Sequence, residues 1–503
     1  MSQSEAKEMN LNKVARGAIF VFVATFIGLG LNYLYGIMLA RWLGADKFGL
    51  FAMGLSVFNI LAVISIMGLD NAALRFIPGA MSAGRMTEVK SLVRIVIILG
   101  CFGGLLAALA LLLSADFLAN VFFNEKHLTL VLCIFALAIP AYSVGTVLFG
   151  ILQAMHDVRW RIFIKYISEP VVKLVLTIAL LVIGWGVSGA LTGFVISLWL
   201  SLLLAFVVVS SKLKSFPPVL DSDKSGADSL ANVMTYSLPI LLGTIFSMVA
   251  NRSDILILGH NFTATQVGIY AAALQTAGII SIILQSVESI VAPVISEALA
   301  SGSRERIEEV YALSLRWVIK LGLPLCISFL LFSEYILGFF GEAFRVATLC
   351  FSLLVVAQFI NLATGSANYV LLLSGKSRMV MWNEIVIGGG QICLNILLIP
   401  KFGIVGAAMA MLIAISAVNV LRVFQVYGLL KIQPYQWVLF KPVLAAVIVF
   451  VSFDWVKQMI PGGLTLILVP LVFIVYFVLL MMFGLHDQDR QALYSLLQRR
   501  RSI

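Results

Sequence analysis

Long apolar stretches, separated by short polar segments, run along almost the whole chain. Fourteen of them reach roughly 20 residues, the length at which an α-helix crosses the hydrocarbon core of a bilayer. They are too long for barrel strands and lack the alternation of apolar and polar residues that such strands show. We therefore predict an all-α polytopic membrane protein with about 14 transmembrane helices. The expected spans are 18–40, 50–69, 95–115, 128–152, 163–184, 188–209, 234–258, 269–292, 313–333, 346–373, 383–399, 405–427, 443–460 and 464–484.

The second part of the chain repeats the first. Two short motifs recur further along the sequence, at nearly the same shift. They are GLFA (Gly49–Ala52) with GIYA (Gly268–Ala271), shifted by 219 residues, and GVSGA (Gly186–Ala190) with GIVGA (Gly403–Ala407), shifted by 217. Many transporters have duplicated membrane halves, with the substrate site between the repeats near the bilayer midplane. The repeat therefore favours a carrier.

The duplication also predicts the domain organisation. Residues 1–213 form an N-lobe of helices one to six, and residues 233–432 a C-lobe of helices seven to twelve. An even number of helices per repeat relates the two lobes by a pseudo-two-fold axis along the membrane normal. Residues 214–232, rich in Pro, Ser, Asp and Lys, are typical of a linker, which we expect in the cytoplasm. Residues 433–503 hold helices thirteen and fourteen and a basic cytoplasmic tail.

Composition and charge agree with a membrane protein. The chain is 61% hydrophobic and 12% charged, with a mean hydropathy of +1.06, whereas soluble domains carry about 25% charged residues. Most of the 34 Lys and Arg residues lie in the tails and the even-numbered loops, and few lie in the odd-numbered loops. This positive-inside bias places both termini in the cytoplasm. The net charge of +10 thus reflects topology, and we expect no nucleic-acid partner.

Catalytic and metal-binding patterns are not found. The five cysteines fall within apolar spans without CxxC spacing, and the four histidines are scattered. The sequence contains no phosphate-binding loop of the GxxxxGK type. We therefore expect no catalytic residue, no metal and no cofactor, and an energy source other than ATP hydrolysis by this chain.

Charged residues inside the spans are the first candidates for function, because each costs a few kcal/mol in hydrocarbon unless it faces a cavity or a partner. Lys173 could bind an anionic substrate, or it could form an ion pair with Glu169, one helical turn earlier. Arg252 could bind a phosphate through its fork of donors, or it could form a salt bridge with Asp254 or with another helix. Asp254, Glu169 and Glu288 are candidates for ion coupling, although Glu288 could equally be the structural partner of a nearby Lys or Arg.

Amide side chains at middle depth form a second group of candidates. Asn32 falls on Asn251 at the shift of 219 residues. Such amides can line an aqueous cavity suited to sugars, and they can also join helices to one another. As a set across both lobes they favour a wet central cavity. The remaining members are Asn59, Gln275, Gln285, Gln358, Asn361, Gln391 and Asn395.

Four segments resemble a known family of membrane proteins. They are LARWLGADKFGLFAMGLSVFNIL (Leu39–Leu61), GLDNAALRFIPG (Gly68–Gly79), NRSDILILGHNFTATQVGIYAAA (Asn251–Ala273) and VAPVISEALASG (Val291–Gly302). These segments are similar to the polysaccharide transporter family, which includes O-antigen flippases. That family belongs to the multidrug/oligosaccharidyl-lipid/polysaccharide flippase superfamily.

The resemblance implies a flippase in the cytoplasmic (inner) membrane of a bacterium or archaeon. Its substrate would be a polyprenyl-diphosphate-linked repeat unit of O-antigen, capsule or exopolysaccharide, moved outward by alternating access. Expected partners are this lipid-linked oligosaccharide, the membrane lipids, and polysaccharide polymerase and assembly proteins. Cationic residues line the cavity of such flippases, and Arg252 and Lys173 are the positions here that would serve. Among the amides we expect Asn32, Asn59, Asn251, Gln358 and Asn361 at the substrate.

Other functions stay open at this point. A cation-coupled multidrug exporter of the same superfamily would need acidic residues deep in the cavity, and these are few. A peptidoglycan-precursor flippase belongs to the same superfamily as well. A membrane enzyme such as a glycan polymerase or ligase would lack the duplicated lobes. Helices thirteen and fourteen could form a groove for the polyprenyl tail, or they could simply pack at the periphery.

Overall fold

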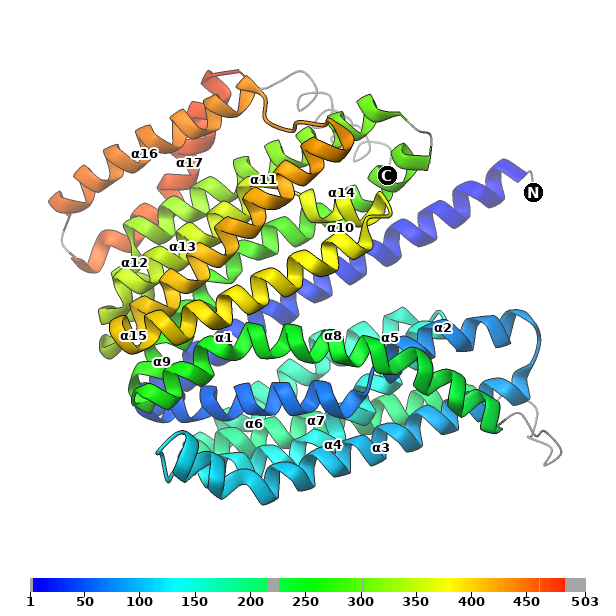
Figure 1. Cartoon of the computed structure of the whole chain (residues 1–503). Helices are drawn as coiled ribbons and strands as arrows, with labels where there is room; N and C mark the ends of the chain where they lie inside the picture. Colours follow the sequence, from blue (N-terminus) through cyan, green and yellow to red (C-terminus); the bar gives the residue numbers. More distant parts are fainter. Residues whose placement is uncertain (1–2, 215–225, 301–302, 461, 485–503) are drawn as a thin grey trace. The chain divides into compact units, whose positions relative to one another are not determined.

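The computed structural model describes residues 3–214, 226–300, 303–460 and 462–484 (Figure 1). Within these ranges the chain is helical and contains no β-strand, so the prediction of an all-α protein is confirmed. The helices are α1 (Gln3–Ile66), α2 (Leu69–Ser82), α3 (Met86–Phe117), η1 (Leu118–Phe122), α4 (Leu128–Ala154), α5 (Val158–Ile162), η2 (Phe163–Ser168), α6 (Glu169–Val182), α7 (Gly186–Lys214), α8 (Gly226–Asn261), α9 (Ala264–Ala277), α10 (Ile279–Ala300), α11 (Arg304–Leu331), α12 (Ser333–Gly338), η3 (Glu342–Ala347), α13 (Thr348–Ala363), α14 (Ala367–Leu373), α15 (Ser377–Leu430), η4 (Trp437–Leu439), α16 (Phe440–Met459), η5 (Gly462–Ile467) and α17 (Leu468–Met482).

Eleven helical segments of the described chain are long and apolar enough to cross a membrane. The number differs from fourteen for two reasons. The segment Val23–Ser82 and helix α15 each contain two of the expected spans, and the expected span 163–184 is not among the eleven. Gly44 (φ 76°) breaks α1 and Gly403 (φ 57°) breaks α15, in backbone conformations that favour glycine. The expected span 163–184 is divided between the π-helix η2 and α6. The apolar pattern thus located the membrane segments, and the two longest helices are kinked at Gly44 and Gly403.

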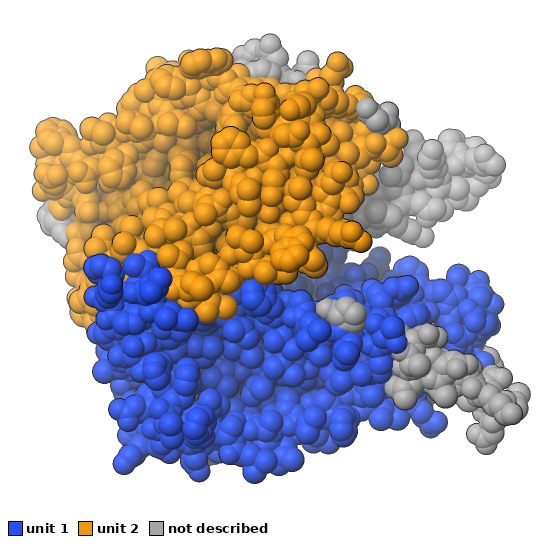
Figure 2. Space-filling model, in the orientation of Figure 1, with its two compact units in different colours: residues 1–272, 395–403 blue, residues 273–394, 404–503 orange. Residues whose placement is uncertain are grey.

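The chain forms two compact units, coloured separately in Figure 2. Unit 1 comprises Met1–Ala272 and Asn395–Gly403, and unit 2 comprises Ala273–Leu394 and Ile404–Ile503. Most of the expected linker (215–225 of 214–232) and the basic tail after Gly484 lie outside the described residues. The boundary between the units differs from the expected boundary between the lobes. Helix α8, which the sequence assigns to the C-lobe, packs against α1 and belongs to unit 1. The division into six-helix lobes therefore stays a prediction.

Unit 1 is built around aromatic and small residues of α1, α4 and α7. Phe58 is buried, and its ring centre lies 5.4 Å from that of Phe135 and 5.5 Å from that of Phe194. The Ser143 hydroxyl, a single donor, lies within hydrogen-bonding distance of the carbonyl oxygens of Ser65 (3.0 Å) and Gly100 (2.9 Å). These contacts join α1, α3 and α4 and give the neighbouring polar side chains a rigid framework.

Unit 2 is organised around α11. The Arg316 side chain is almost completely buried and donates a hydrogen bond to the Gln436 side chain (2.7 Å), just before α16 begins. At the other end of α16, the Lys457 ammonium donates to the Leu331 carbonyl oxygen at the end of α11 (2.6 Å). The expected helix thirteen, α16, is therefore attached to α11 at both ends.

Candidate polar sites within the membrane helices

Lys173 of α6 is buried and lies against two residues of α1. Its ammonium donates a hydrogen bond to the side-chain oxygen of Asn32 and lies 4.8 Å from the centre of the Tyr35 ring. The centre of the Phe194 ring on α7 is 5.8 Å away. The charge of Glu169, one turn earlier, also acts on the ammonium. The structure thus brings together three predicted residues, with an amide as the hydrogen-bond acceptor.

The helix that carries Lys173 is preceded by the π-helix η2. Such π-helical turns are rare and frequently occur at functional sites. Lys165 of η2 is half-buried, and the charges of Arg161 and Glu169 act on it. Arg161 donates a hydrogen bond to the side chain of Gln153 on α4. The consecutive helices α5, η2 and α6 therefore carry four cations, Arg159, Arg161, Lys165 and Lys173, and a single carboxylate, Glu169.

Arg252 of α8 is half-buried and its charge acts on the carboxylate of Asp254, but the two side chains form no salt bridge in the described chain. Asp254 is 2% exposed and accepts hydrogen bonds from the Tyr270 hydroxyl (2.7 Å) and the Ile255 backbone N–H (2.7 Å). No ion pair joins Arg252 to Asp254 in the described chain, and the Nε of Arg252 is buried without a hydrogen-bond partner there. The guanidinium therefore keeps donor capacity for an anion.

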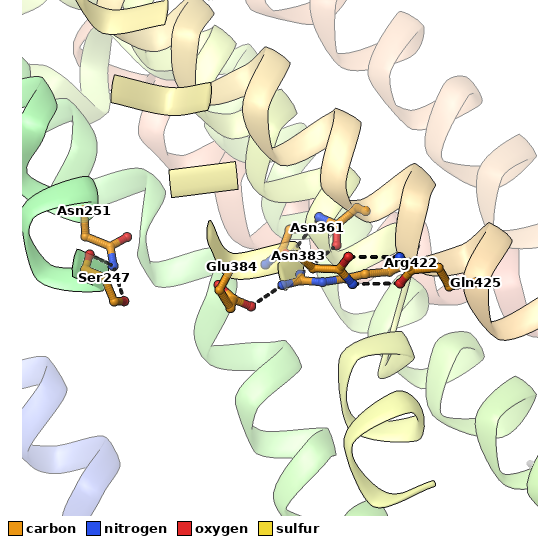
Figure 3. A network of polar contacts seen from close by, with 8 residues as sticks. Ser247, Asn251, Asn361, Asn383, Glu384, Arg422 and Gln425 are labelled. Carbon is orange, nitrogen blue, oxygen red and sulfur yellow. Dashed lines mark hydrogen bonds and ion pairs between the residues drawn. The ribbon is translucent and has the colours of Figure 1, made fainter. Parts of the chain in front are cut away.

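Two further amides lie on or against α8. The Asn395 side chain, on the first half of α15, donates to the Ser253 hydroxyl (2.9 Å), so this amide joins two helices. Asn251 is exposed and donates to the Ser247 carbonyl oxygen of its own helix (2.9 Å; Figure 3). The Asn251 amide oxygen thus stays available to a ligand, whereas Asn395 has a structural contact.

A larger polar network occupies unit 2 (Figure 3). Arg422, on the second half of α15, forms an ion pair with Glu384 on the first half and donates to the Asn419 side-chain oxygen (3.3 Å). Asn419 donates in turn to the side-chain oxygen of Asn361 on α13 (3.0 Å). Glu288 of α10 lies near enough for the charge of Arg422 to act on it. The hydrogen bonds and the ion pair therefore join α13 to the two halves of α15 and include one of the predicted residues, Asn361.

A reciprocal amide pair supports this network. The Asn383 amide donates to the Gln425 side-chain oxygen (2.7 Å), and the Gln425 amide donates back to Asn383 (2.9 Å). The pair joins the two halves of α15, as the ion pair of Arg422 does. Both connections fix the rotation of one half-helix against the other.

Other predicted residues lie apart from these clusters. Gln358 is buried on α13 and Asn59 is half-buried on α1, and neither belongs to the hydrogen-bond networks described above. The substrate and coupling roles expected of the candidate residues stay predictions.

Four members of the unit 2 network have no role in the sequence-based hypothesis: Glu384, Asn383, Asn419 and Gln425. Arg422 could be recognised from the sequence as a cation inside an expected span, the same signal that selected Lys173 and Arg252. Its partners could not be identified, because 38 residues separate it from Glu384.

Comparison with known proteins identifies the family. The family described as "Polysaccharide biosynthesis protein" matches residues 14–299, which is more than half of the chain. The chain belongs to this family. A second family, MatE, matches residues 239–400. The family expected from the sequence is thereby confirmed.

Individual relatives agree. The probable low-salt glycan biosynthesis flippase Agl15 of Haloferax volcanii is 25% identical over 84% of this chain and 85% of its own length. The solved structure of the lipid II flippase MurJ in an inward closed conformation matches 92% of this chain and 98% of its own, with a TM-score of 0.70 and 14% identity. An inward-facing multidrug resistance MATE transporter matches 81% of this chain and 98% of its own, with a TM-score of 0.65 and 15% identity.

These findings establish the broad class. The protein is a multi-pass membrane protein and a flippase of the multidrug/oligosaccharidyl-lipid/polysaccharide superfamily. The two structural matches, at such low identity, describe the fold alone, so the substrate must be inferred from the polar sites.

Proposed function

We propose that this flippase moves a polyprenyl-diphosphate-linked oligosaccharide from the cytoplasmic to the outer leaflet by alternating access. The repeat unit would belong to an O-antigen, capsule or exopolysaccharide. The membrane would be the cytoplasmic (inner) membrane, with both chain termini in the cytoplasm, as the distribution of Lys and Arg indicates.

The observation that supports this proposal most directly is the unused hydrogen-bond donor of Arg252. Its guanidinium is half-buried in an apolar helix, and its Nε has no hydrogen-bond partner in the described chain. The neighbouring carboxylate of Asp254 is occupied by Tyr270 and Ile255. A diphosphate within the membrane needs compensating charge, and an arginine fork binds phosphate oxygens well. Arg252 is therefore the residue that we expect at the diphosphate.

Lys173 is the second cation that we assign to substrate binding. Its ammonium is held by Asn32 and lies near two aromatic rings, and these contacts orient it inside unit 1. In our proposal Lys173 contributes positive charge near the headgroup path, and Asn251 contacts a sugar hydroxyl with its free amide oxygen. Asp254, Glu169 and Glu288 remain the candidates for coupling ion movement to transport.

The experiment that tests the proposal is reconstitution of the purified protein into vesicles. The probes are a polyprenyl diphosphate bearing a short oligosaccharide, the peptidoglycan precursor lipid II, and a cationic dye. We expect the protein to expose the oligosaccharide lipid on the opposite leaflet and to leave the dye distribution unchanged. Transport of the dye alone would overturn the proposal in favour of a multidrug exporter. Transport of lipid II alone would favour a peptidoglycan-precursor flippase.

A further inference from the structure

One line of side chains along α8 changes character in the middle of the helix. Steps of three and four residues place side chains on one face of an α-helix. Starting from Val233, such steps lead through Ser237, Ile240, Thr244, Ser247, Asn251 and Asp254 to Leu258. Both ends of this line are buried, whereas Thr244, Ser247 and Asn251 in its middle are exposed. We call these three residues the α8 track.

Contacts within unit 1 explain the two buried ends of the line. Ser237 packs against the start of α2, since a Cβ added at Gly68 would lie 2.9 Å from the Ser237 carbonyl oxygen. Beyond the track, Asp254 accepts a hydrogen bond from the Tyr270 hydroxyl of α9 (2.7 Å). Helix α8 is therefore fixed to unit 1 on both sides of the track, and the track itself stays uncovered.

The α8 track is polar, whereas other exposed helix faces of unit 1 are apolar. On α3, Phe102, Leu105, Leu109 and Leu113 follow one another at steps of three and four residues, and all are more than half exposed. The track has the same spacing, carries only polar side chains, and lies inside the candidate membrane span Val233–Asn261. Polar atoms cost free energy against hydrocarbon. The track therefore favours contact with water or with a polar ligand over contact with lipid tails.

The track keeps hydrogen-bond acceptors for a ligand. The Thr244 hydroxyl donates to the Ile240 carbonyl oxygen (2.8 Å), and the Asn251 amide donates to the Ser247 carbonyl oxygen (2.9 Å; Figure 3). These local bonds occupy donors, and neither the Thr244 hydroxyl oxygen nor the Asn251 amide oxygen accepts a hydrogen bond from the described chain. Such oxygens accept hydrogen bonds from the hydroxyl groups of a sugar and offer nothing to a phosphate.

Arg252 directly follows the track in the sequence. Its Nε is buried without a hydrogen-bond partner in the described chain, and we assign it to the diphosphate. With a rise of 1.5 Å per residue, Thr244 lies roughly 10 Å from Asn251 along the helix. A sugar chain attached to the diphosphate begins next to Arg252 and can follow α8 as far as Thr244.

We propose that the α8 track binds the first sugars of the lipid-linked substrate through their hydroxyl groups. This inference rests on the proposed function, because the sugars belong to the lipid-linked oligosaccharide. It adds Thr244 and Ser247 to the substrate contacts and divides the work along one helix. Arg252 binds the diphosphate, and the track binds the adjoining saccharide.

The first test measures water access in vesicles, with a membrane-impermeant thiol reagent applied to both sides. The native cysteines, two of which are exposed, are replaced beforehand. Ser247→Cys and Asn251→Cys should react at least tenfold faster than Leu113→Cys, which places a thiol on the exposed apolar face of α3. Equally slow reaction at all three positions would show that the track faces lipid. That result would overturn this inference and leave the proposed function in place.

The second test measures sugar contact by transport kinetics. The substrate is a polyprenyl diphosphate disaccharide, and the competitor is sugar-free polyprenyl diphosphate. Thr244→Val combined with Asn251→Leu should raise the apparent KM for the disaccharide lipid about tenfold, the equivalent of two neutral hydrogen bonds. The inhibition constant of the sugar-free lipid should stay unchanged, whereas Arg252→Ala should weaken the binding of both lipids. The two single variants should each raise the KM by a smaller factor.

The matched control is Ser114→Ala on α3. It removes a hydroxyl that, like that of Thr244, donates to a carbonyl oxygen of its own helix, here that of Ala110 (2.7 Å). Both constants should stay at their wild-type values. An unchanged KM in the double variant, or an equal weakening of both lipids, would overturn the track while leaving the proposed function in place. A wild type that does not move the disaccharide lipid would instead overturn the proposed function, and this inference with it.

Discussion

Gly49 and Gly268 occupy equivalent positions in the two repeats, and they lie against each other in unit 1. A Cβ added at Gly49 would overlap the carbonyl oxygen of Ala264, and a Cβ added at Gly268 would overlap that of Ala45. Ala45 and Ala264 are themselves repeat equivalents, so the contact is reciprocal. It has the pattern expected near a pseudo-two-fold axis, where small residues let two helices approach closely.

The close approach predicts that Gly49→Ala and Gly268→Ala each destabilise the protein by about 1–3 kcal/mol, the usual cost of overpacking. The physical reason is that the added methyl group meets rigid backbone atoms. The measurement is the thermal unfolding midpoint of the purified protein in detergent.

Gly30→Ala on α1 and Gly243→Ala on α8 are the matched controls, since an added Cβ finds open space at both positions. Alanine is the better helix former by about 1 kcal/mol, so these variants should be neutral or slightly stabilising. Equal effects at all four glycines would contradict the close contact.

Arg252→Ala should lower the rate of lipid-linked oligosaccharide transport by about 10- to 100-fold, the equivalent of one or two hydrogen bonds to a charged group. Arg252→Lys should retain more activity, because it keeps the charge but loses the fork of donors. The measurement is the initial rate in vesicles at equal protein content. The control is Arg306→Ala, which breaks an exposed ion pair with Glu297 and should leave the transport rate unchanged. An unimpaired Arg252→Ala variant would remove the diphosphate assignment.

Asn32→Leu should destabilise unit 1 by about 1.5–3 kcal/mol, because it deprives the buried Lys173 ammonium of its acceptor. Asn32→Asp should restore stability, since a carboxylate can take the place of the amide oxygen. Thermal unfolding of each variant provides the measurement. Thr25→Val is the control, because the Thr25 hydroxyl donates its hydrogen bond to the Val21 carbonyl oxygen of its own helix. A stable Asn32→Leu protein would mean that the ammonium finds another partner.

Gln436→Leu should loosen the connection between α15 and α16, because the buried Arg316 loses its contact with the Gln436 side chain. We expect faster proteolytic cleavage between residues 431 and 436 than in the wild type. Tyr435→Phe, which removes one hydrogen bond to the Ala363 carbonyl oxygen, should give a smaller increase. The cleavage rates are compared by limited proteolysis and mass spectrometry, and equal rates in all three proteins would refute the anchoring role.

Much of the fold could be predicted from local pattern. Apolar runs of bilayer length form the membrane helices because the backbone must satisfy its own hydrogen bonds in lipid. The repeat pair Gly186 and Gly403 has the same left-handed backbone region in both copies, with φ of 53° and 57°. The positions of the apolar membrane segments were therefore accessible from residue types and spacing, and the family from the four similar segments.

The candidate site was predicted less completely. A charge inside an apolar run signals importance, and this signal selected Lys173 and Arg252. It does not say which way the side chain points, because each residue turns a helix by about 100° and packing sets the rotation. For that reason the Asn32 partner of Lys173, 141 residues away, became visible only in the folded structure.

Composition and apolar run lengths by themselves determined that this protein is helical and spans a membrane several times, because these properties reflect the bilayer and the helix backbone. Internal repetition favoured a carrier, and the flippase class followed from the resemblance of four segments to a known family. Tertiary structure alone decided that Asp254 bonds to Tyr270 and leaves Arg252 available, and that Arg422 is held by Glu384 and Asn419. Pairing of polar groups depends on which helix faces meet, and only the packing of the whole chain settles that.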